Sequence, residues 1–521
     1  MTNSNSTAST NSPIGRGTYH LFLGNLSFTF AGAITSIVIG RILAPDRFGL
    51  YAIALIVPTY VYLALQFGLP STATRFSAKY LSEGDEKRAI SFSYAILAVH
   101  LGVGLLAFAL LIPFTSEISI YVLHRPELSN GLVIPVALLS IVGLILFNDG
   151  SGAFLGLHRF RETASFQVVN GFSKLAISVL LVVLGFSVFG AVVGYTLGFL
   201  VSGTISLIML VVMNGSLVPR NVRESVATSF GYAPPIYFSS IVFGIIAPFQ
   251  STILAYQVSN TEIGWYTAAA SIATLISLFT YPISNAVFPL FSKTMEGGTK
   301  QLALAFKLSV KYAALLVIPL TMFVMAFAAP LSIAIYGRAY ASAGNYLLLY
   351  AVVNLLAGAG SLSDGPFLYG VGETRKAFVA TAVGSATSIG ASLLLVFYLG
   401  VYGIIVGTIL GQGISLYISL RYISDILGAK PSAWFFGRVY VASALSAVII
   451  YPISSFIPNP YLSVPLGALI FLLVLIPIMT VMKALTEDDL DGLRAQLRDV
   501  RVMSSLLRLI SRYQRFLLRR K

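Results

Sequence analysis

The sequence predicts an all-α polytopic membrane protein with fourteen transmembrane helices, arranged as two parallel six-helix bundles followed by two further helices. Three observations support this fold class. Hydrophobic residues make up 57% of the chain and charged residues only 10%, whereas soluble domains carry roughly 25% charged residues. Fourteen segments are apolar over the length that crosses a bilayer, which is about 20 residues. The membrane-embedded part also occurs twice, in the same orientation.

The duplication is visible in residues that an apolar composition alone does not explain. The matched residues are Phe48-Gly49-Leu50-Tyr51 with Ile263-Gly264-Trp265-Tyr266, Phe76 with Phe291, Asp149-Gly150 with Asp364-Gly365, and Gly190, Gly194 and Gly198 with Gly403, Gly407 and Gly411. Two homologous bundles, related here by a pseudo-twofold axis along the membrane normal, are a common plan of secondary transporters, which hold substrate between the halves. Transport is therefore the first functional hypothesis.

The predicted spans run in order along the chain, six in each repeat and two after them. They are 18–40, 48–69, 90–113, 131–156, 164–185, 188–213, 231–256, 263–290, 308–329, 346–369, 378–399, 402–420, 439–457 and 461–483. The corresponding regions are a disordered N-terminus at 1–17, the first bundle at 18–213, a cytoplasmic linker at 214–230, the second bundle at 231–423, helices thirteen and fourteen within 424–484, and a tail at 485–521. Glycines four residues apart in spans six and twelve indicate faces where helices pack closely.

Basic residues predict the orientation of these spans. Loops after even-numbered spans hold seventeen Lys and Arg residues, whereas loops after odd-numbered spans hold Arg41, Arg47, Arg125 and Arg338. Since cytoplasmic loops carry the excess of positive charge, we expect the even loops and both termini to be cytoplasmic. The expected location is the cell membrane.

The tail after Thr486 has a different pattern. Leu and Arg residues each recur at helical spacing, which predicts a basic amphipathic helix on the anionic cytoplasmic leaflet, with a coiled-coil or partner contact as the alternative. The net charge of +14 comes largely from this tail and the cytoplasmic loops, so no nucleic-acid partner is predicted.

The chain contains no motif that predicts an enzyme. It has no cysteine, and its four histidines are too scattered in the sequence to indicate a metal site. It also lacks a phosphate-binding loop and any recognisable nucleophile or metalloprotease motif. No cofactor is predicted.

Ionisable residues inside spans are the best candidates for a substrate site, because each costs about 2.5–3.5 kcal/mol to insert and usually faces a cavity or a partner. Asp149 and Asp364 occupy matching places in the two repeats, where they are either helix-end caps or charges on the seam between the halves. Lys174 lies deep in the fifth span, as an anion ligand or as the ion-pair partner of one of these aspartates. The other polar candidates for the cavity are Arg41, Arg75, Asn25 and His100. Snorkelling to lipid phosphates is the alternative for the two arginines, and helix cross-linking is the alternative for Asn25 and His100.

The start of the chain also resembles a known family. The run from Gly40 to Ala52 (GRILAPDRFGLYA), followed by Phe67-Gly68-Leu69 and Ala73-Thr74-Arg75-Phe76, is similar to the opening of Wzx-type polysaccharide flippases in the multidrug/oligosaccharidyl-lipid/polysaccharide superfamily. The resemblance implies a V-shaped pair of bundles that moves an isoprenoid-pyrophosphate-linked oligosaccharide to the outer leaflet. It also implies cationic residues in the cavity, for which Arg41, Arg75 and Lys174 are the candidates, and glycan-assembly proteins as possible partners.

Two other functions remain as alternatives. A cation-coupled exporter of organic cations from the same superfamily resembles a twelve-span design with a carboxylate in the first span, where this chain offers Asn25. A membrane glycosyltransferase or polymerase would need acidic or Arg/His clusters in a large outward-facing loop, and no odd-numbered loop here exceeds about twenty residues.

Overall fold

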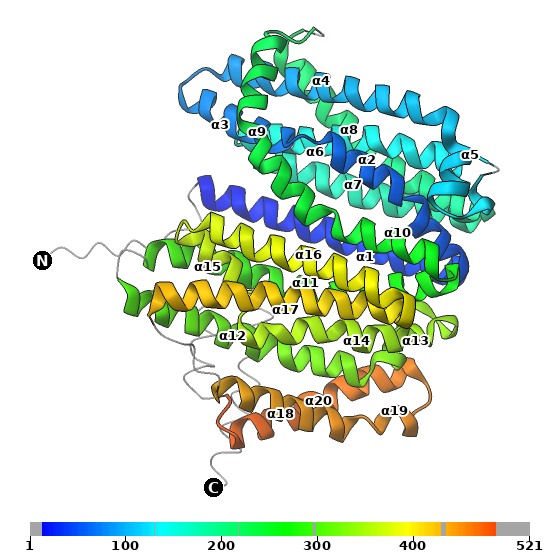
Figure 1. Ribbon diagram of the computed structural model, residues 1–521, viewed down its shortest axis with the longest axis vertical. Coiled ribbons are helices and arrows are strands. Elements are labelled where there is room, and N and C mark those ends of the chain that lie inside the picture. The colour runs from blue at the N-terminus through cyan, green and yellow to red at the C-terminus, as the bar shows by residue number, and fades with distance from the viewer. Residues whose placement is uncertain (1–12, 130, 217, 295–297, 429–433, 486–521) are drawn as a thin grey trace, which may run out of the picture. The chain divides into compact units, whose positions relative to one another are not determined.

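The computed structural model describes residues 13–129, 131–216, 218–294, 298–428 and 434–485, and all regular secondary structure in these ranges is helical. The chain divides into two compact units, of which the first ends at Thr267 and the second begins at Ala268. Figure 1 labels the helices and colours the chain from blue at the N-terminus to red at the C-terminus. The predicted tail at 485–521 lies outside the described residues except for Leu485. Of the N-terminal segment predicted to be disordered, residues 1–12 lie outside the described residues and residues 13–17 begin a helix.

The first unit is built from ten α-helices in chain order. They are α1 (Pro13–Ala54), α2 (Ile56–Leu65), α3 (Leu69–Ser82), α4 (Glu86–Leu111), α5 (Thr115–Glu117), α6 (Val133–Gly156), α7 (Phe160–Leu181), α8 (Ser187–Asn214), α9 (Val222–Gly244) and α10 (Ile246–Gln257). Helix α11 (Asn260–Thr294) then carries the chain across the boundary between the units. Helices α9 and α10, which follow the predicted linker, pack within this first unit, where α9 contacts α3 and α4.

The second unit continues with nine helices. They are α12 (Thr299–Ala326), α13 (Ala328–Tyr336), α14 (Ala343–Leu355), α15 (Asp364–Gly370), α16 (Thr374–Leu399), α17 (Val401–Leu427), α18 (Trp434–Ile450), α19 (Ile453–Phe456) and α20 (Pro460–Val481). Helices α18 and α20, near the positions of predicted spans thirteen and fourteen, pack against each other, and α18 also packs against α12.

Nine helical segments of the described chain are long and apolar enough to cross a membrane, and two bent helix pairs bring the number to eleven if each pair is one span. The protein is therefore an all-helical, multi-pass membrane protein. Two of the nine segments are very long, with 47 residues in Tyr19–Leu65 and 55 residues in Phe160–Asn214. Each contains positive backbone φ angles near its middle, at Ala44 (59°) before Pro45 and at Gly185 (93°) and Ser187 (49°).

The two repeated glycine series form the tight seams of two helix hairpins, as the sequence predicts. Along α8, Gly190, Gly194 and Gly198 lie against Leu181, Ser178 and Lys174 of α7, so the partner numbers fall as the glycine numbers rise and the helices are antiparallel. The same series in the second unit places Gly403, Gly407 and Gly411 of α17 against Leu395, Ser392 and Ser388 of α16. A Cβ at Gly194 or Gly407 would overlap the backbone of the facing serine, which is why the close approach requires glycine.

A second pair of repeated glycines is in mutual contact within the first unit. A Cβ added to Gly49 would overlap the carbonyl oxygen of Asn260, and a Cβ added to Gly264 would overlap the carbonyl oxygen of Pro45. Gly264 and Asn260 each lie 215 positions after Gly49 and Pro45. The break in α1 and the start of α11 are thus related by a local twofold contact in which each copy meets the equivalent residue of the other.

Candidate functional site

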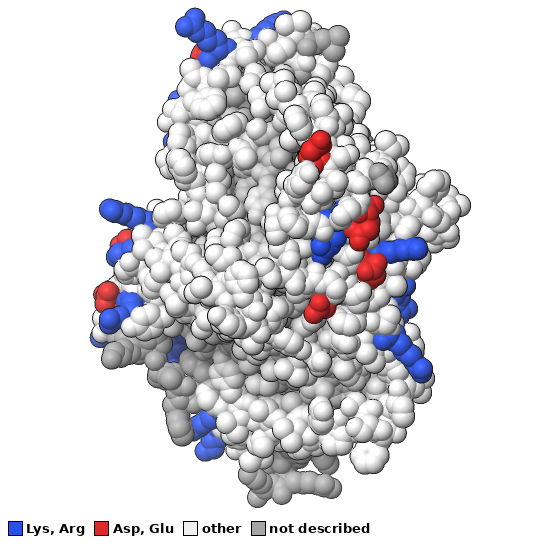
Figure 2. All heavy atoms as spheres, turned by 45° about the vertical axis from the view of Figure 1, so that its right-hand side comes forward, with Lys and Arg blue, Asp and Glu red and all other residues white. Residues whose placement is uncertain are grey.

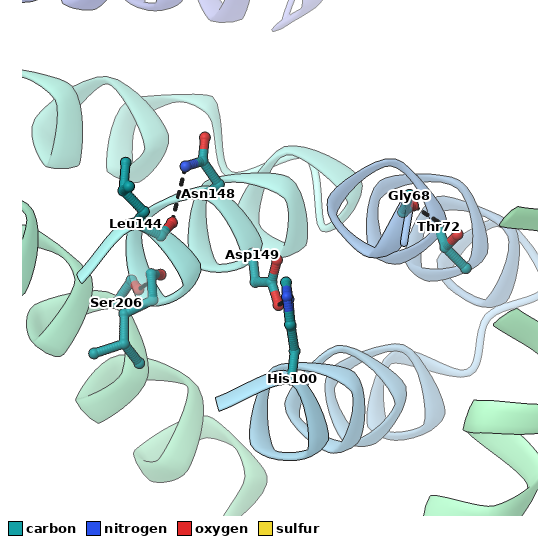
Figure 3. Close-up of polar contacts among 8 residues, drawn as sticks. Gly68, Thr72, His100, Leu144, Asn148, Asp149 and Ser206 are labelled. Carbon is teal, nitrogen blue, oxygen red and sulfur yellow. Dashed lines mark hydrogen bonds and ion pairs between the residues drawn. The ribbon is translucent and has the colours of Figure 1, made fainter. Parts of the chain in front are cut away.

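A histidine and an aspartate form a buried pair inside the first unit. His100 extends from α4 and Asp149 from α6, and the two side chains point toward each other (Figure 3). The distance between His100 Nδ1 and Asp149 Oδ2 is 2.7 Å, and the two side chains are 0% and 1% exposed. The described structure thus brings together two of the polar residues that the sequence suggested as cavity candidates.

Each residue of this pair also has a polar atom with no hydrogen-bond partner. Nε2 of His100 and Oδ1 of Asp149 are buried and make no hydrogen bond within the described structure. Neighbouring polar side chains are instead satisfied by backbone carbonyls: Thr72 donates to Gly68 (2.9 Å) and Asn148 donates to Leu144 (2.8 Å) (Figure 3). Since buried polar atoms are normally hydrogen-bonded, these two atoms without hydrogen-bond partners require an explanation.

Helix packing places the pair at this depth. Gly104, one turn after His100, lies against Ile145, one turn before Asp149, so α4 and α6 approach closely one turn away from the pair. Gly152, three residues after Asp149, lies against the backbone of Pro70 at the start of α3. Tyr62 of α2 is near enough to interact electrostatically with Asp149.

Lys174 has an aromatic partner. Its ammonium nitrogen is 4.9 Å from the ring centre of Tyr195 on α8, and its Cβ lies 2.7 Å from where a Cβ on Gly198 would be. The lysine is half-buried. A carboxylate partner was the alternative from the sequence, but the described partner of Asp149 is His100 and that of Lys174 is the tyrosine ring, a cation–π contact.

Aromatic side chains fill the space beyond this lysine. Tyr195 lies 5.1 Å from Phe199 between ring centres, Phe199 lies 5.4 Å from Phe147, and Phe147 stacks at 6.0 Å on Phe28. Phe147 is two residues before Asp149. A continuous series of packed rings from α8, α6 and α1 therefore runs from Lys174 to Phe147 and Phe28.

The remaining candidates are more peripheral. Arg41 on α1 is exposed, and Asn25 on the same helix is half-buried, with its backbone carbonyl accepting a hydrogen bond from Thr29. Arg75 on α3 is exposed, and its guanidinium lies 4.0 Å from the ring centre of Tyr232 on α9. Sequence reasoning missed both tyrosines that hold the cations. On the face shown in Figure 2, Lys, Arg, Asp and Glu side chains cover only small areas of an otherwise uncharged surface.

Asp364 is surrounded differently from its counterpart in the first unit. It is the first residue of the short helix α15, which follows a turn with Gly360 at φ 110°. Its carboxylate lies near the Ser419 hydroxyl and the backbone amide of Gly365. No three His, Cys, Asp or Glu side chains gather as a metal site among the residues that the structure describes.

Comparison with known proteins adds a family and a fold. The family model described as "Polysaccharide biosynthesis protein" matches residues 14–295, which is more than half of the chain. A protein of Escherichia coli (strain K12) described as a candidate O-antigen transporter is 22% identical over 266 residues, a match that spans 49% of this chain and 59% of that protein. The chain thus matches less than two thirds of the length of this relative.

Solved structures share the fold at low sequence identity. A lipid II flippase, MurJ, in an inward closed conformation has a TM-score of 0.73 at 15% identity, covering 88% of this chain and 98% of that one. An inward-facing multidrug resistance MATE transporter of the MOP superfamily has a TM-score of 0.63 at 18% identity, covering 77% and 94%. A MOP superfamily transporter from Pyrococcus furiosus, described as having a binding pocket of reverse polarity, has a TM-score of 0.57 at 17% identity, covering 82% and 99%. At these identities the likeness establishes the fold alone.

Proposed function

Since this chain belongs to the polysaccharide biosynthesis protein family, we propose that it is a flippase that moves an isoprenoid-(pyro)phosphate-linked oligosaccharide from the cytoplasmic to the outer leaflet. The relative described as a candidate O-antigen transporter supports this substrate class, and the fold shared with a lipid II flippase is compatible with it. The chain is a transporter and not an enzyme, so the proposed mechanism is alternating access. Glycan-assembly proteins are the proposed partners.

We propose fourteen crossings. The two longest candidate spans exceed the about 20 residues that one crossing needs by more than twofold, and each has a backbone break near its middle. If each is two crossings, the nine segments supply eleven. The two bent helix pairs supply two more, and the 35-residue helix α11 supplies the last. The repeat boundaries at 18–213 and 231–423 and the two extra helices within 424–484 belong to this proposal.

The proposed orientation has both termini on the cytoplasmic side of the cell membrane. It rests on the seventeen basic residues in even-numbered loops against four in the odd-numbered loops. Cysteines introduced into this cysteine-free chain at the exposed Gly84 and at Ser129 test it. We expect an impermeant maleimide to label position 129 in intact cells and position 84 only after lysis. The reverse labelling would invert the topology. Anionic lipids are the proposed partners of the tail, which lies outside the described residues except for Leu485.

The observation that carries the substrate assignment is Lys174. Its ammonium lies in a predicted span, against an aromatic ring, and no carboxylate contacts it among the described residues. A cation placed in this way can bind a phosphate oxygen in a medium of low dielectric constant, where charge-assisted hydrogen bonds are strong. Arg41 and Arg75 are the further proposed cationic ligands. Asn25, His100 and Asp149 are proposed as further polar groups of the substrate site in the first unit, and Asp364 is the proposed polar group of the second unit.

The test is translocation of a fluorescent lipid-linked oligosaccharide in proteoliposomes that contain the purified protein, read as loss of accessibility to an impermeant quencher. Because a hydrogen bond to a charged group contributes about 1.5–3 kcal/mol, we expect Lys174→Gln to slow flipping roughly 10- to 100-fold and Lys174→Arg to retain part of the rate. Lys79→Gln is the matched control, since Lys79 is exposed on α3.

Two results would contradict the assignment. Full activity of Lys174→Gln would remove this lysine as a substrate ligand, and recovery of activity when Lys174→Gln is combined with Asp149→Asn would make it a structural partner instead. If the vesicles move organic cations against a gradient and leave the lipid-linked sugar in place, the alternative of an ion-coupled multidrug exporter is correct.

A further inference from the structure

We propose that the His100–Asp149 pair is a proton-binding site, and that its loading and release are coupled to the conformational cycle of the transporter. The inference rests on the proposed function, because it assigns an energy source to that same transport. It starts from two buried atoms of the pair, an imidazole nitrogen and a carboxylate oxygen, which lack hydrogen-bond partners in the described structure.

The geometry identifies where the proton goes. With Nδ1–H donating to Oδ2 of Asp149 at 2.7 Å, Nε2 of His100 carries the lone pair and is the atom that accepts a proton (Figure 3). Uptake transfers a proton from hydronium to Nε2, so that one N–H bond forms as an O–H bond of the hydronium breaks, and the charge of the pair changes from −1 to zero. Release returns the proton from the same atom to water.

The surroundings make these two charge states unequal. Both side chains are almost fully buried in a helical unit that crosses the membrane, where an uncompensated negative charge is strongly disfavoured. The neutral, proton-loaded pair therefore favours the closed packing seen here, whereas the charged pair favours an arrangement that admits water between α4 and α6. A two-state protein whose states differ in proton affinity is coupled to the proton gradient.

The cations near the pair have partners elsewhere. On the helices that pack against α4 and α6, the ionisable groups include Tyr51 on α1, Tyr62 on α2, Arg75 and Tyr80 on α3, Lys174 on α7, Tyr195 on α8, and Glu224 and Tyr232 on α9. Arg75 lies over Tyr232, Lys174 lies over Tyr195, and Arg88 of α4 forms a 2.7 Å ion pair with Glu224. The described contacts of these cations are thus with other groups, which leaves the negative charge of Asp149 to be balanced by His100.

The first experiment observes the proton without any substrate. The chain has four histidines, so ¹⁵N-histidine labelling gives few ring signals, and the signal lost in His100→Gln identifies His100. We expect its Nε2 resonance to change from that of a neutral ring to that of a doubly protonated ring as the pH is lowered, while the protein stays folded. A ring that keeps one protonation state at every pH at which the protein is folded would overturn the proposal.

The second experiment tests the coupling. In proteoliposomes, the wild-type flipping rate should vary with pH by up to about tenfold per pH unit on one limb of the profile, as a single proton-binding group requires. His100→Gln and Asp149→Asn should flatten that profile to within about twofold, and His20→Gln, at an exposed histidine on α1, should keep it.

A His100→Gln protein with the wild-type pH profile would refute the coupling, and this variant keeps the test valid if Asp149→Asn does not fold. If the ring titrates but no lipid-linked sugar moves under any condition, the proposed substrate is wrong while the proton site stands, so the two proposals fail separately.

Discussion

Asp149 and Asp364 occupy the same place in the sequence repeat and have different physical roles. Asp149 lies inside the unbroken helix α6, is 1% exposed and is bound to His100. Asp364 begins a short helix after a turn, is half-buried, and lies near the Ser419 hydroxyl and the backbone amide of Gly365. An acid at a helix start is stabilised by the free amides and the helix dipole. The difference shows that the duplicated carboxylate is the buried partner of a histidine in one unit and an acid in the first turn of a short helix in the other.

The two hairpins show the same divergence on a conserved backbone. Gly198 faces Lys174 in α7, and its counterpart Gly411 faces Ser388 in α16. The close backbone contact is retained, while a cation stands in one unit where a hydroxyl stands in the other. Symmetry in this chain is therefore a property of the packing glycines, and the charges depart from it.

The largest expected difference concerns the two aspartates. Asp149→Ala leaves a buried histidine without its acid, and breaking a buried ion pair typically costs about 3–5 kcal/mol. Asp364→Ala removes an acid from the first turn of α15, which costs at most about 1 kcal/mol. Unfolding of each variant in detergent measures its free energy of unfolding. Equal losses of this free energy for the two variants would contradict the proposed difference between the aspartates. The double variant His100→Leu/Asp149→Leu should recover much of the loss, because it removes both buried polar groups.

Two matched arginines sharpen the comparison outside the spans. Arg125 donates to the carbonyls of Ala255 and Val258 at 2.8 Å each, whereas Arg338, 213 positions later, is exposed. We expect Arg125→Ala to cost about 2–3 kcal/mol of unfolding free energy and Arg338→Ala less than about 0.5 kcal/mol.

Burial lowers the pKa of the Arg125 guanidinium from its ordinary value near 12.5. Because arginine nevertheless stays charged at neutral pH, the difference between the two variants should be the same at about pH 6 and pH 8. Thermal unfolding in detergent measures the effect of both variants. Equal shifts of the melting temperature would mean that the hydrogen bonds of Arg125 contribute nothing to stability.

The smallest expected difference is between the two hairpin seams, where the comparison predicts similarity. Gly194→Ala and Gly407→Ala each force a methyl group against a facing serine, at a cost of about 1–3 kcal/mol that should agree within about 1 kcal/mol. Gly413→Ala is the control, since open space surrounds that position. A large loss at one seam only, measured by thermal unfolding in detergent, would mean that the hairpins are not equivalent.

Much of the fold follows from local sequence, and most of the site does not. The span predicted at 131–156 corresponds to α6 at Val133–Gly156, because length and apolar composition define a span almost completely. The seams of glycines were likewise predictable, since close backbone approach demands glycine. The predicted interval between the first two spans also contains the break at Ala44.

The pairing of His100 with Asp149 was not predictable from the same patterns. The pairing depends on how α4 and α6 are rotated about their axes. A helix that is apolar on most sides has no polar face in its sequence pattern from which this rotation could be predicted. The partner of Lys174 was missed for the same reason: charge suggested an acid, while the facing helix presents the ring of Tyr195. Aromatic residues spaced along α8 were the available signal.

The reciprocal contact of Gly49 and Gly264 has an evolutionary consequence. Gly49 lies against Asn260, and its repeat equivalent Gly264 lies against Pro45, which is the repeat equivalent of Asn260. Such a reciprocal contact is the pattern of an isologous interface between identical subunits. A half-length ancestor could have made this contact with a second copy of itself, and gene fusion would then have placed both partners in one polypeptide. The two positions would then have evolved together, since a larger side chain at either one would be accommodated only by a change about 215 residues away in the sequence.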